Sequence, residues 1–417
     1  MAPGGALTLA APPPRLVRLA VKLATRGPSV ALREIRKWHL RRAYMHGAAR
    51  ARSATFEETD PALVSTGRAL RDELLRTAEG RHAALGYRVL MLQPSSITAD
   101  IWFGDLARCM NHLGVACRLL RADATSAVLH AAFEEFQPNV FIAAEAPESL
   151  QAVDLPRLER YKRERGCLRL LVPVWHANAP RKDVPGSRPT AAQDEWRRAL
   201  RHKGLLADAH LSIFEPEFHE RFAADPAAPV EYAVIPMAAN PFVDFPVAAV
   251  KRYDYFMAAS MTDERVEVAA RFLWHVLRGY QGLWAGPSWG FGLHSIPHAE
   301  MPRHYAESRI ALSPLVGFVH RYAAELTHRV FAAAACGAFQ ITMPTAVTGR
   351  FFAPQELVQA ATPEEYARLF DHYVERPLER NAIALAALRR AYAEHTCIHR
   401  VDKLVSHWND WRRRGMF

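Results

Sequence analysis

The sequence predicts an α/β protein with two Rossmann-like domains and a basic helical N-terminal extension. Short apolar runs alternate with helical stretches from about residue 81 onward, a pattern typical of parallel sheets covered by helices. The 417 residues, half of them hydrophobic, are enough for two cores. A stretch at 240–254 separates two such alternating regions and indicates an interdomain linker.

These observations divide the chain into four parts. We expect a basic helical extension at 1–80, a first Rossmann-like domain at 81–245, a second at 250–380, and C-terminal helices at 381–417.

In the first domain, apolar runs predict buried parallel strands at 87–93, 115–122, 139–145 and 168–175. His176 directly follows the last of these runs. Open α/β sheets place ligand-contacting side chains at such strand ends, so His176 is a candidate general base that takes a proton from a hydroxyl group. The alternative is a hydrogen-bonded structural histidine, since the chain contains 19 histidines.

The second domain contains a βαβ unit with a small-residue helix. An apolar strand ends at Pro314, a helix begins near Thr327 and ends at Gly337, and another strand follows at once. The N-terminal N–H groups of such a helix point into the crevice at the strand ends, where a diphosphate can bind. Arg321, His328 and Arg329 add positive charge or donors near this point.

Two further loops of the second domain are expected to face the same crevice. Ser260 ends a strand and precedes a helix start that includes Arg265. Gly286 lies in the glycine-containing loop 284–292, where the backbone must approach another group closely. For Arg329, a salt bridge inside the domain remains the alternative.

Several short motifs occur in an order that resembles one enzyme family. They are Arg329, Phe331, Cys336 and Gly337 around the small-residue helix, then Phe352, Pro354 and Glu356, Thr362 at a Thr-Pro-Glu-Glu helix start, Arg380 in Glu-Arg-Pro-x-x-Arg, and His395, Thr396 and Arg400. Over roughly residues 230–405 the chain resembles the CgeB-like (spore-maturation-protein-like) glycosyltransferases of the GT-B superfamily.

The resemblance implies a GT-B fold, in which two domains face each other across a cleft. It further implies that a sugar moves from a nucleotide-diphosphate sugar on the second domain to an acceptor on the first, without a metal ion. The expected donor-binding residues are Ser260, Arg265, Gly286, Arg321, Glu325, Thr327, His328 and Arg329. Many relatives have Glu where this chain has Ala332, so Glu325 is considered as a substitute ribose partner.

Two alternatives to a transferase follow from the sequence. A non-catalytic nucleotide-sugar-binding protein of the same fold is favoured by Ala332. A Rossmann oxidoreductase is disfavoured because no Gly-x-Gly-x-x-Gly follows the first strand. The expected transferase is hexosyltransferase-like (EC 2.4) and takes part in polysaccharide or glycoconjugate synthesis; its acceptor is a glycan, a lipid-linked molecule or a small molecule.

The extension accounts for the whole net charge of +10, since residues 1–55 contain eleven Lys or Arg and a single Glu. Leu32, Ile35, His39 and Ala43 predict one helical face, with Trp38 beside it and arginines opposite. We expect a basic helix packed on the enzyme; the alternative is attachment of residues 15–53 to an anionic membrane surface. No aromatic-basic RNA motif is present, so nucleic acid is not an expected partner.

Five widely spaced cysteines, with no Cys-x-x-Cys pair, indicate reduced side chains and no zinc site. We therefore expect no metal and no cofactor besides the donor substrate. The sequence has no long apolar run and no signal-peptide pattern, which predicts a cytoplasmic protein, with peripheral attachment at the inner face of the membrane as the alternative.

Overall fold

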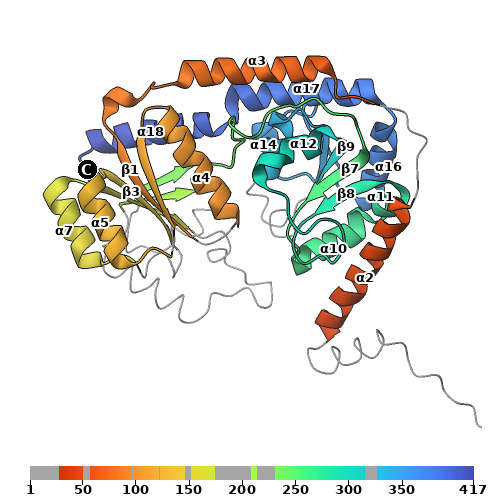
Figure 1. Ribbon diagram of the computed structural model, residues 1–417, viewed down its shortest axis with the longest axis horizontal. Helices are drawn as coiled ribbons and strands as arrows, with labels where there is room; N and C mark the ends of the chain where they lie inside the picture. The colour runs from red at the N-terminus through yellow and green to blue at the C-terminus, as the bar shows by residue number, and fades with distance from the viewer. Residues whose placement is uncertain are drawn as a thin grey trace, which may run out of the picture.

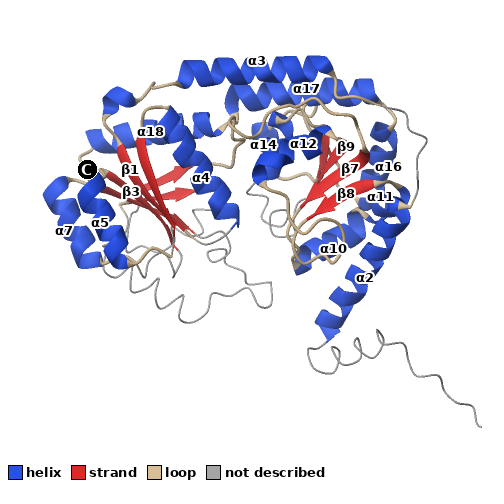
Figure 2. Ribbon diagram, viewed as in Figure 1, coloured by secondary structure: helices blue, strands red, loops and turns tan. Residues whose placement is uncertain are grey.

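The computed structural model describes residues 28–49, 57–94, 97–121, 123–145, 152–173, 208–213, 231–314 and 326–417. These residues form two α/β domains, each with a central sheet covered by helices (Figures 1 and 2). Long helices run along one side of both domains (Figure 1). The predicted fold class is confirmed.

The first domain has a six-stranded sheet in the described part of the chain, and all of its neighbouring strands are parallel. Its strand order is β2-β1-β3-β4-β5-β6. The strands are β1 (Arg88–Gln93), β2 (Ala116–Arg121), β3 (Val140–Glu145), β4 (Leu168–Pro173), β5 (Ala209–Ser212) and β6 (Glu231–Val234). The helices are η1 (Ala83–Leu85), α4 (Ile97–His112), α5 (Ser126–Phe136) and α7 (Leu155–Arg165).

The second domain has a five-stranded parallel sheet of order β11-β10-β9-β7-β8 among the described residues. The strands are β7 (Tyr253–Ala258), β8 (Gly282–Ala285), β9 (Ser308–Ser313), β10 (Gln340–Thr342) and β11 (Val358–Gln359). The helices are α10 (Asp263–Phe272), α11 (Trp274–Gly279), η2 (His298–Glu300), α12 (Met301–Ala306), α14 (His328–Ala335), α15 (Thr348–Phe351) and α16 (Pro363–Val374).

The strand order reverses beside the first strand of each sheet. In the first sheet β1 lies between β2 and β3, and in the second sheet β7 lies between β8 and β9. Connections from such a strand leave toward opposite faces of the sheet, and this opens a crevice at the carboxyl ends of the strands. Ligands are therefore expected beyond the ends of β1 and β3 and of β7 and β9.

The N-terminal helix α2 (Pro28–Ala48) packs against α10 and α11 of the second domain (Figure 1). Its buried residues are Ala31, Leu40, Ala43 and Gly47. The predicted apolar face is therefore wrong in part, since Leu32 and His39 are exposed. Small residues determine which face is buried, because a Cβ at Gly47 would lie 2.3 Å from the carbonyl oxygen of Leu277.

The C-terminal helices connect the two domains. Helix α17 (Pro377–Glu394) packs on α14 and on α3 (Pro61–Ala78), whereas α18 (Cys397–Arg413) packs on α4 of the first domain. At the crossing, Arg400 donates to the carbonyl oxygens of Pro236 (3.0 Å) and Met237 (3.1 Å). His395 lies against the ring of Phe331 and contacts the carbonyl oxygen of Phe351 at 2.7 Å. These motif residues fix the junction of α17 and α18 to the end of the first domain and to the second domain.

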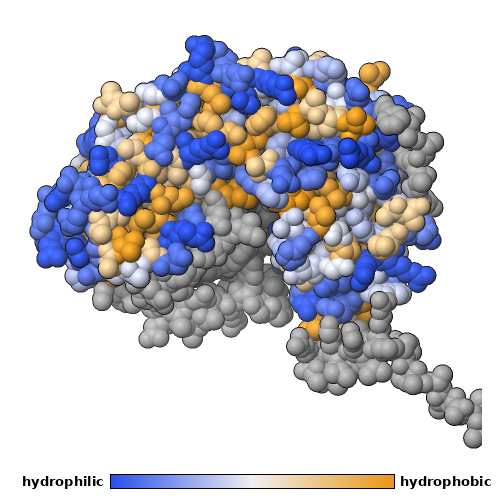
Figure 3. Space-filling view, in the orientation of Figure 1, coloured by the Kyte–Doolittle hydropathy of each residue, from blue (hydrophilic) through white to orange (hydrophobic). Residues whose placement is uncertain are grey.

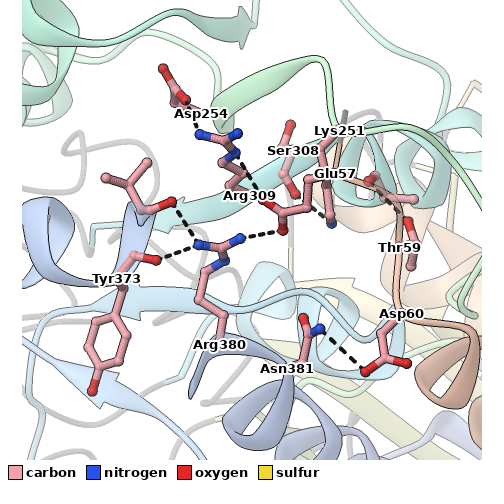
Figure 4. Close-up of polar contacts among 12 residues, drawn as sticks. Glu57, Thr59, Asp60, Lys251, Asp254, Ser308, Arg309, Tyr373, Arg380 and Asn381 are labelled. Carbon is pink, nitrogen blue, oxygen red and sulfur yellow. Dashed lines mark hydrogen bonds and ion pairs between the residues drawn. The ribbon is translucent and has the colours of Figure 1, made fainter. Parts of the chain in front are cut away.

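An ionic network fixes the amino ends of β7 and β9 (Figure 4). Glu57 pairs with Arg380 of α17 and, at 3.0 Å, with Arg309 of β9. Arg309 also pairs with Asp254 of β7 at 3.2 Å, and Lys251 donates to the carbonyl oxygen of Ser308 at 2.8 Å. The network joins the segment before α3, the second sheet and α17.

The linker 240–254 contains no helix or strand longer than an isolated bridge, apart from the first two residues of β7. It is not solvated throughout, because Asn240 and Asp244 are almost completely buried. Among the described residues, no helix has the length and apolar character that a membrane crossing requires.

Candidate functional site

The loops after β7 and β8 meet at the crevice of the second domain. Thr262 caps α10 by accepting from the backbone N–H of Arg265 (3.2 Å), which places Arg265 in the first turn of the helix beside the end of β7. The Arg265 guanidinium donates to the carbonyl oxygen and to the hydroxyl of Ser260, both at 2.7 Å. The predicted residues Ser260 and Arg265 are therefore in contact.

Gly286 lies directly beside this loop. Its φ is +146°, and a Cβ at this position would lie 1.8 Å from the carbonyl oxygen of Ala259, so only glycine fits. The indole N–H of Trp289 donates to the same carbonyl oxygen at 2.7 Å. The close backbone approach predicted for Gly286 is thus made to the loop after β7, which it fixes in place.

Arg329, in the first turn of α14, is a partly buried cation near Arg265. Its guanidinium contacts the sulfur of Met257 at 3.9 Å, and burial lowers its pKa. Burial and the charge of Arg329 together lower the pKa of Arg265 to about 10. Within the described ranges neither arginine forms an ion pair with a carboxylate. Two neighbouring cations without a carboxylate ion-pair partner favour a bound anion.

Helix α14 begins at His328, one residue before this arginine. Thr327 is its N-cap residue, and the Thr327 side chain makes no capping hydrogen bond. The helix packs closely through its buried alanines and is followed by Gly337, whose φ of +66° ends it. Its first-turn N–H groups point out of the helix and add to the positive potential of the two guanidinium groups.

A second polar group, formed by Asp105, Asn240, Asp244, His298 and His328, lies where the two domains meet. We call it the interdomain cluster. Asn240 donates its side-chain amide to Asp105 (2.6 Å) and its backbone N–H to Asp244 (2.8 Å). His328 Nε2 lies 3.7 Å from Asp105 Oδ2 and 3.6 Å from Asp244 Oδ2, and His298 Nε2 lies 3.4 Å from Asp244 Oδ1.

Burial shifts the pKa values in the interdomain cluster. Burial and then the neighbouring charge of Asp244 raise the pKa of Asp105 to about 7. Burial lowers the pKa of His328 to about 4, so this imidazole is neutral at pH 7. Burial alone would also lower the pKa of His298, but Asp244 and Asp105 outweigh it and the net shift is upward.

The structure thus brings together Ser260, Arg265, Gly286, Thr327, His328 and Arg329 on the carboxyl side of the second sheet. His328 belongs to the interdomain cluster, whose other members the sequence did not single out. Arg321, Glu325 and His176 lie outside the described residues. Whether these side chains bind a donor stays a prediction.

Comparison with solved structures supports the architecture. Sucrose-phosphate synthase from Thermosynechococcus elongatus is similar with a TM-score of 0.58 and 11% sequence identity, over 79% of this chain and 100% of that chain. The chain has the GT-B fold. Anabaena HepE in complex with UDP-glucose is also similar (TM-score 0.53, 10% identity, 78% and 99% covered). An α-glucosyltransferase in complex with UDP-glucose and DNA containing an abasic site is similar with a TM-score of 0.52 and 9% sequence identity, over 76% of this chain and 98% of that chain.

Sequence comparison gives a narrower match. The family model described as glycosyl transferase-like matches residues 261–406, which contain α10, α14 and the crossing into α18. No curated protein matches the sequence. The match therefore includes Arg265 and Arg329 but not the first domain. The more specific CgeB-like resemblance stays a prediction.

Proposed function

We propose that the protein is a glycosyltransferase that takes a sugar from a nucleotide-diphosphate sugar bound to the second domain. The observation that carries this proposal is the pair Arg265 and Arg329, which have no carboxylate partner in the described segments. Arg265 is in the first turn of α10 and Arg329 is in the first turn of α14. The pair lies within the glycosyl transferase-like match, in a chain of GT-B fold.

The arrangement suits the departure of a diphosphate. Negative charge accumulates on the leaving phosphate as the bond to the sugar breaks, and groups already oriented toward that charge lower the barrier. Arg329 and the first-turn N–H groups of α14 would supply this stabilisation. In this mechanism no metal ion on the diphosphate is required.

The acceptor would bind to the first domain, at the carboxyl ends of its strands. His176 is proposed as the general base that removes the proton of the acceptor hydroxyl. The acceptor class is a glycan, a lipid-linked molecule or a small molecule, as in polysaccharide or glycoconjugate synthesis. We also propose membership of the CgeB-like group.

The donor is proposed to be a nucleoside-diphosphate hexose. Two of the similar structures are complexes with UDP-glucose, so uridine nucleotides are the first to test. Thermal denaturation with UDP, GDP, CDP and dTDP and with their sugar conjugates would identify the nucleotide. A ligand present at 100 times its Kd should add about 2.7 kcal/mol of stability. If no nucleoside diphosphate changes the melting temperature at millimolar concentration, the proposal is wrong.

A non-catalytic nucleotide-sugar-binding protein is the second candidate, and Ala332 favours it. Ala332 is only 3% exposed and occupies the place where the resembling family has a ribose-binding Glu. The two candidates differ in turnover, so release of nucleotide from a bound donor in the presence of acceptors identifies the enzyme.

The Ala332→Glu variant is a second test of the binding-protein candidate. Tighter donor binding, by about 1.5–3 kcal/mol, would indicate a family-like ribose site, and a destabilised variant without tighter binding would favour a different ligand.

We further propose that α2 contacts an anionic membrane surface. One exposed side carries Trp38 (42% exposed) and Met45 (57%) together with the exposed Arg41 and Arg42, and Leu32 (48%) is exposed nearer the start of the helix. Because α2 packs on the second domain, point variants are a cleaner test than deletion. Trp38→Glu should reduce co-sedimentation with anionic vesicles, whereas Val128→Glu, on the first domain, should not. Equal sedimentation of wild type and Trp38→Glu would reject this proposal.

A further inference from the structure

The interdomain cluster contains buried polar atoms that the described part of the protein leaves unsatisfied. They are Asp105 Oδ2, Asp244 Oδ1, His298 Nε2 and His328 Nε2, each of which is inaccessible to solvent and has no hydrogen-bond partner there. Asp105 is 6% exposed and Asp244 is fully buried. An unpaired buried polar atom is costly, and four that point toward one another indicate a missing common partner.

The spacing of these atoms suits a metal ion better than it suits direct hydrogen bonds. The carboxylate–imidazole distances of 3.4, 3.6 and 3.7 Å are longer than ordinary hydrogen bonds. Ligands at about 2.0–2.1 Å from a tetrahedral zinc ion lie about 3.3 Å from one another. The ligand atoms of Asp105, His298 and His328 all lie within 4.8 Å of one another. Among these three residues, His328 Nε2 and Asp105 Oδ2 lie 3.7 Å apart, so side-chain rotations must bring the ligand atoms together around an ion. The fourth tetrahedral position is left for Asp244 or a water molecule.

Supporting contacts hold the carboxylates in the required orientation. Asn240 binds Asp105 Oδ1 through its amide and Asp244 Oδ2 through its backbone N–H. The second oxygen of each carboxylate is thereby directed at the imidazoles. Partners that orient the ligands in this way are a regular part of protein metal sites.

We propose that Asp105, His298 and His328 bind a divalent transition-metal ion, with Asp244 as an adjacent carboxylate. Two imidazoles and one carboxylate favour Zn²⁺ over Mg²⁺ or Ca²⁺, which prefer oxygen ligands. The side chains of His298 and His328 are 24% and 17% exposed, although their Nε2 atoms are covered, so the edge of the cluster lies near the protein surface. This site departs from the sequence-based expectation that the protein needs no metal.

The location of the ligands gives the metal an architectural role. Asp105 belongs to α4 of the first domain, whereas His298 and His328 belong to η2 and α14 of the second. Asn240 and Asp244 come from the linker between them. A bound ion therefore clamps α4 against the start of α14 and fixes the relative position of the two domains.

Zinc titration of the metal-free full chain tests the proposal. After treatment with a chelator and dialysis, the wild type should bind about one equivalent of Zn²⁺, and its melting temperature should rise with zinc concentration. His298→Ala and Asp105→Asn should each weaken zinc binding at least about 100-fold, and Asn240→Leu about 10- to 100-fold. His275→Ala is the matched control, since this exposed histidine pairs with Asp371 outside the cluster, and it should bind zinc like the wild type.

The melting temperatures of the metal-free variants show whether each one folds. His298 has the most exposed of the three ligand side chains, so its variant is the one expected to fold without metal. Sub-stoichiometric zinc in the wild type, or wild-type affinity in a folded His298→Ala variant, would overturn the proposal. Zinc is measured without nucleotide, so failure here leaves the proposed transferase activity untouched.

Discussion

Two pairs of arginines lie at opposite ends of the central strands β7 and β9, and they differ in their counter-charges. At the amino ends, Arg309 and Arg380 are paired with Glu57 and Asp254 (Figure 4). At the carboxyl ends, Arg265 and Arg329 have no carboxylate partner among the described residues. At one end of the sheet the arginines therefore have carboxylate partners, and at the other end they have none among the described residues.

The difference separates structural charges from binding charges. When the carboxylate partner of a buried arginine is removed, the protein loses stability, because a desolvated charge is left without a counter-charge. An arginine without a partner already bears that cost, and a bound anion would relieve it. On the face shown in Figure 3, hydrophilic and hydrophobic residues are mixed over both domains.

The largest expected effect is a loss of protein stability when the paired arginines at the amino ends of β7 and β9 lose their shared carboxylate. Glu57→Gln removes the carboxylate that Arg309 and Arg380 share, while the side-chain volume is nearly unchanged. We expect the free energy of unfolding to fall by about 3–5 kcal/mol, measured by urea denaturation. A loss below 1 kcal/mol would show that the network contributes little.

The second-largest expected effect is weaker nucleotide binding when an arginine without a carboxylate partner is removed. Arg329→Met should weaken binding of UDP or another nucleoside diphosphate by about 1.5–3 kcal/mol, roughly a 10- to 150-fold change in Kd. Stability without ligand should stay the same or increase, because an uncompensated charge is removed. A variant that is strongly destabilised instead would place Arg329 among the structural arginines.

Arg265→Met should have a smaller effect, about 1 kcal/mol in the same calorimetric titration. The guanidinium of Arg265 is already engaged by Ser260, and its removal also relieves repulsion with Arg329. If Arg265→Met weakens binding more than Arg329→Met does, the anion lies nearer the loop after β7 than the start of α14.

The smallest expected effect comes from an exposed ion pair, which serves as a control for the buried pairs at Glu57. Glu73 and Arg76 form an exposed ion pair on α3, with side chains 60% and 70% accessible. Glu73→Gln should change the free energy of unfolding by less than about 0.5 kcal/mol, since solvent screens the pair. If Glu73→Gln lowered the free energy of unfolding as much as Glu57→Gln does, burial would not determine how much an ion pair contributes to stability.

Local patterns predicted the fold well. Alternating apolar runs marked the strands, Thr262 and Thr362 marked helix starts, and Gly337 marked the end of α14. Each of these signals depends on neighbours in the chain, so it is readable without tertiary structure.

The interdomain cluster and the network at Glu57 could not be predicted in this way. Asp105 and His328 are separated by more than 200 residues and meet only because α4 and α14 face each other. Glu57 likewise pairs with Arg380 across most of the chain. The buried face of α2 was missed because small residues, rather than apolar size, determine how closely it approaches α11.

The central claim is that the unpaired arginines form a diphosphate site while the paired ones hold the fold. Calorimetric titration of UDP, followed by GDP, CDP and dTDP, into the wild type, Arg329→Met and Glu57→Gln tests it most directly. The account predicts that Arg329→Met binds the preferred nucleotide 10- to 150-fold more weakly. Folded Glu57→Gln, kept below its lowered melting temperature, should retain the wild-type Kd. Equal affinities for wild type and Arg329→Met, or a loss of affinity confined to Glu57→Gln, would contradict the account.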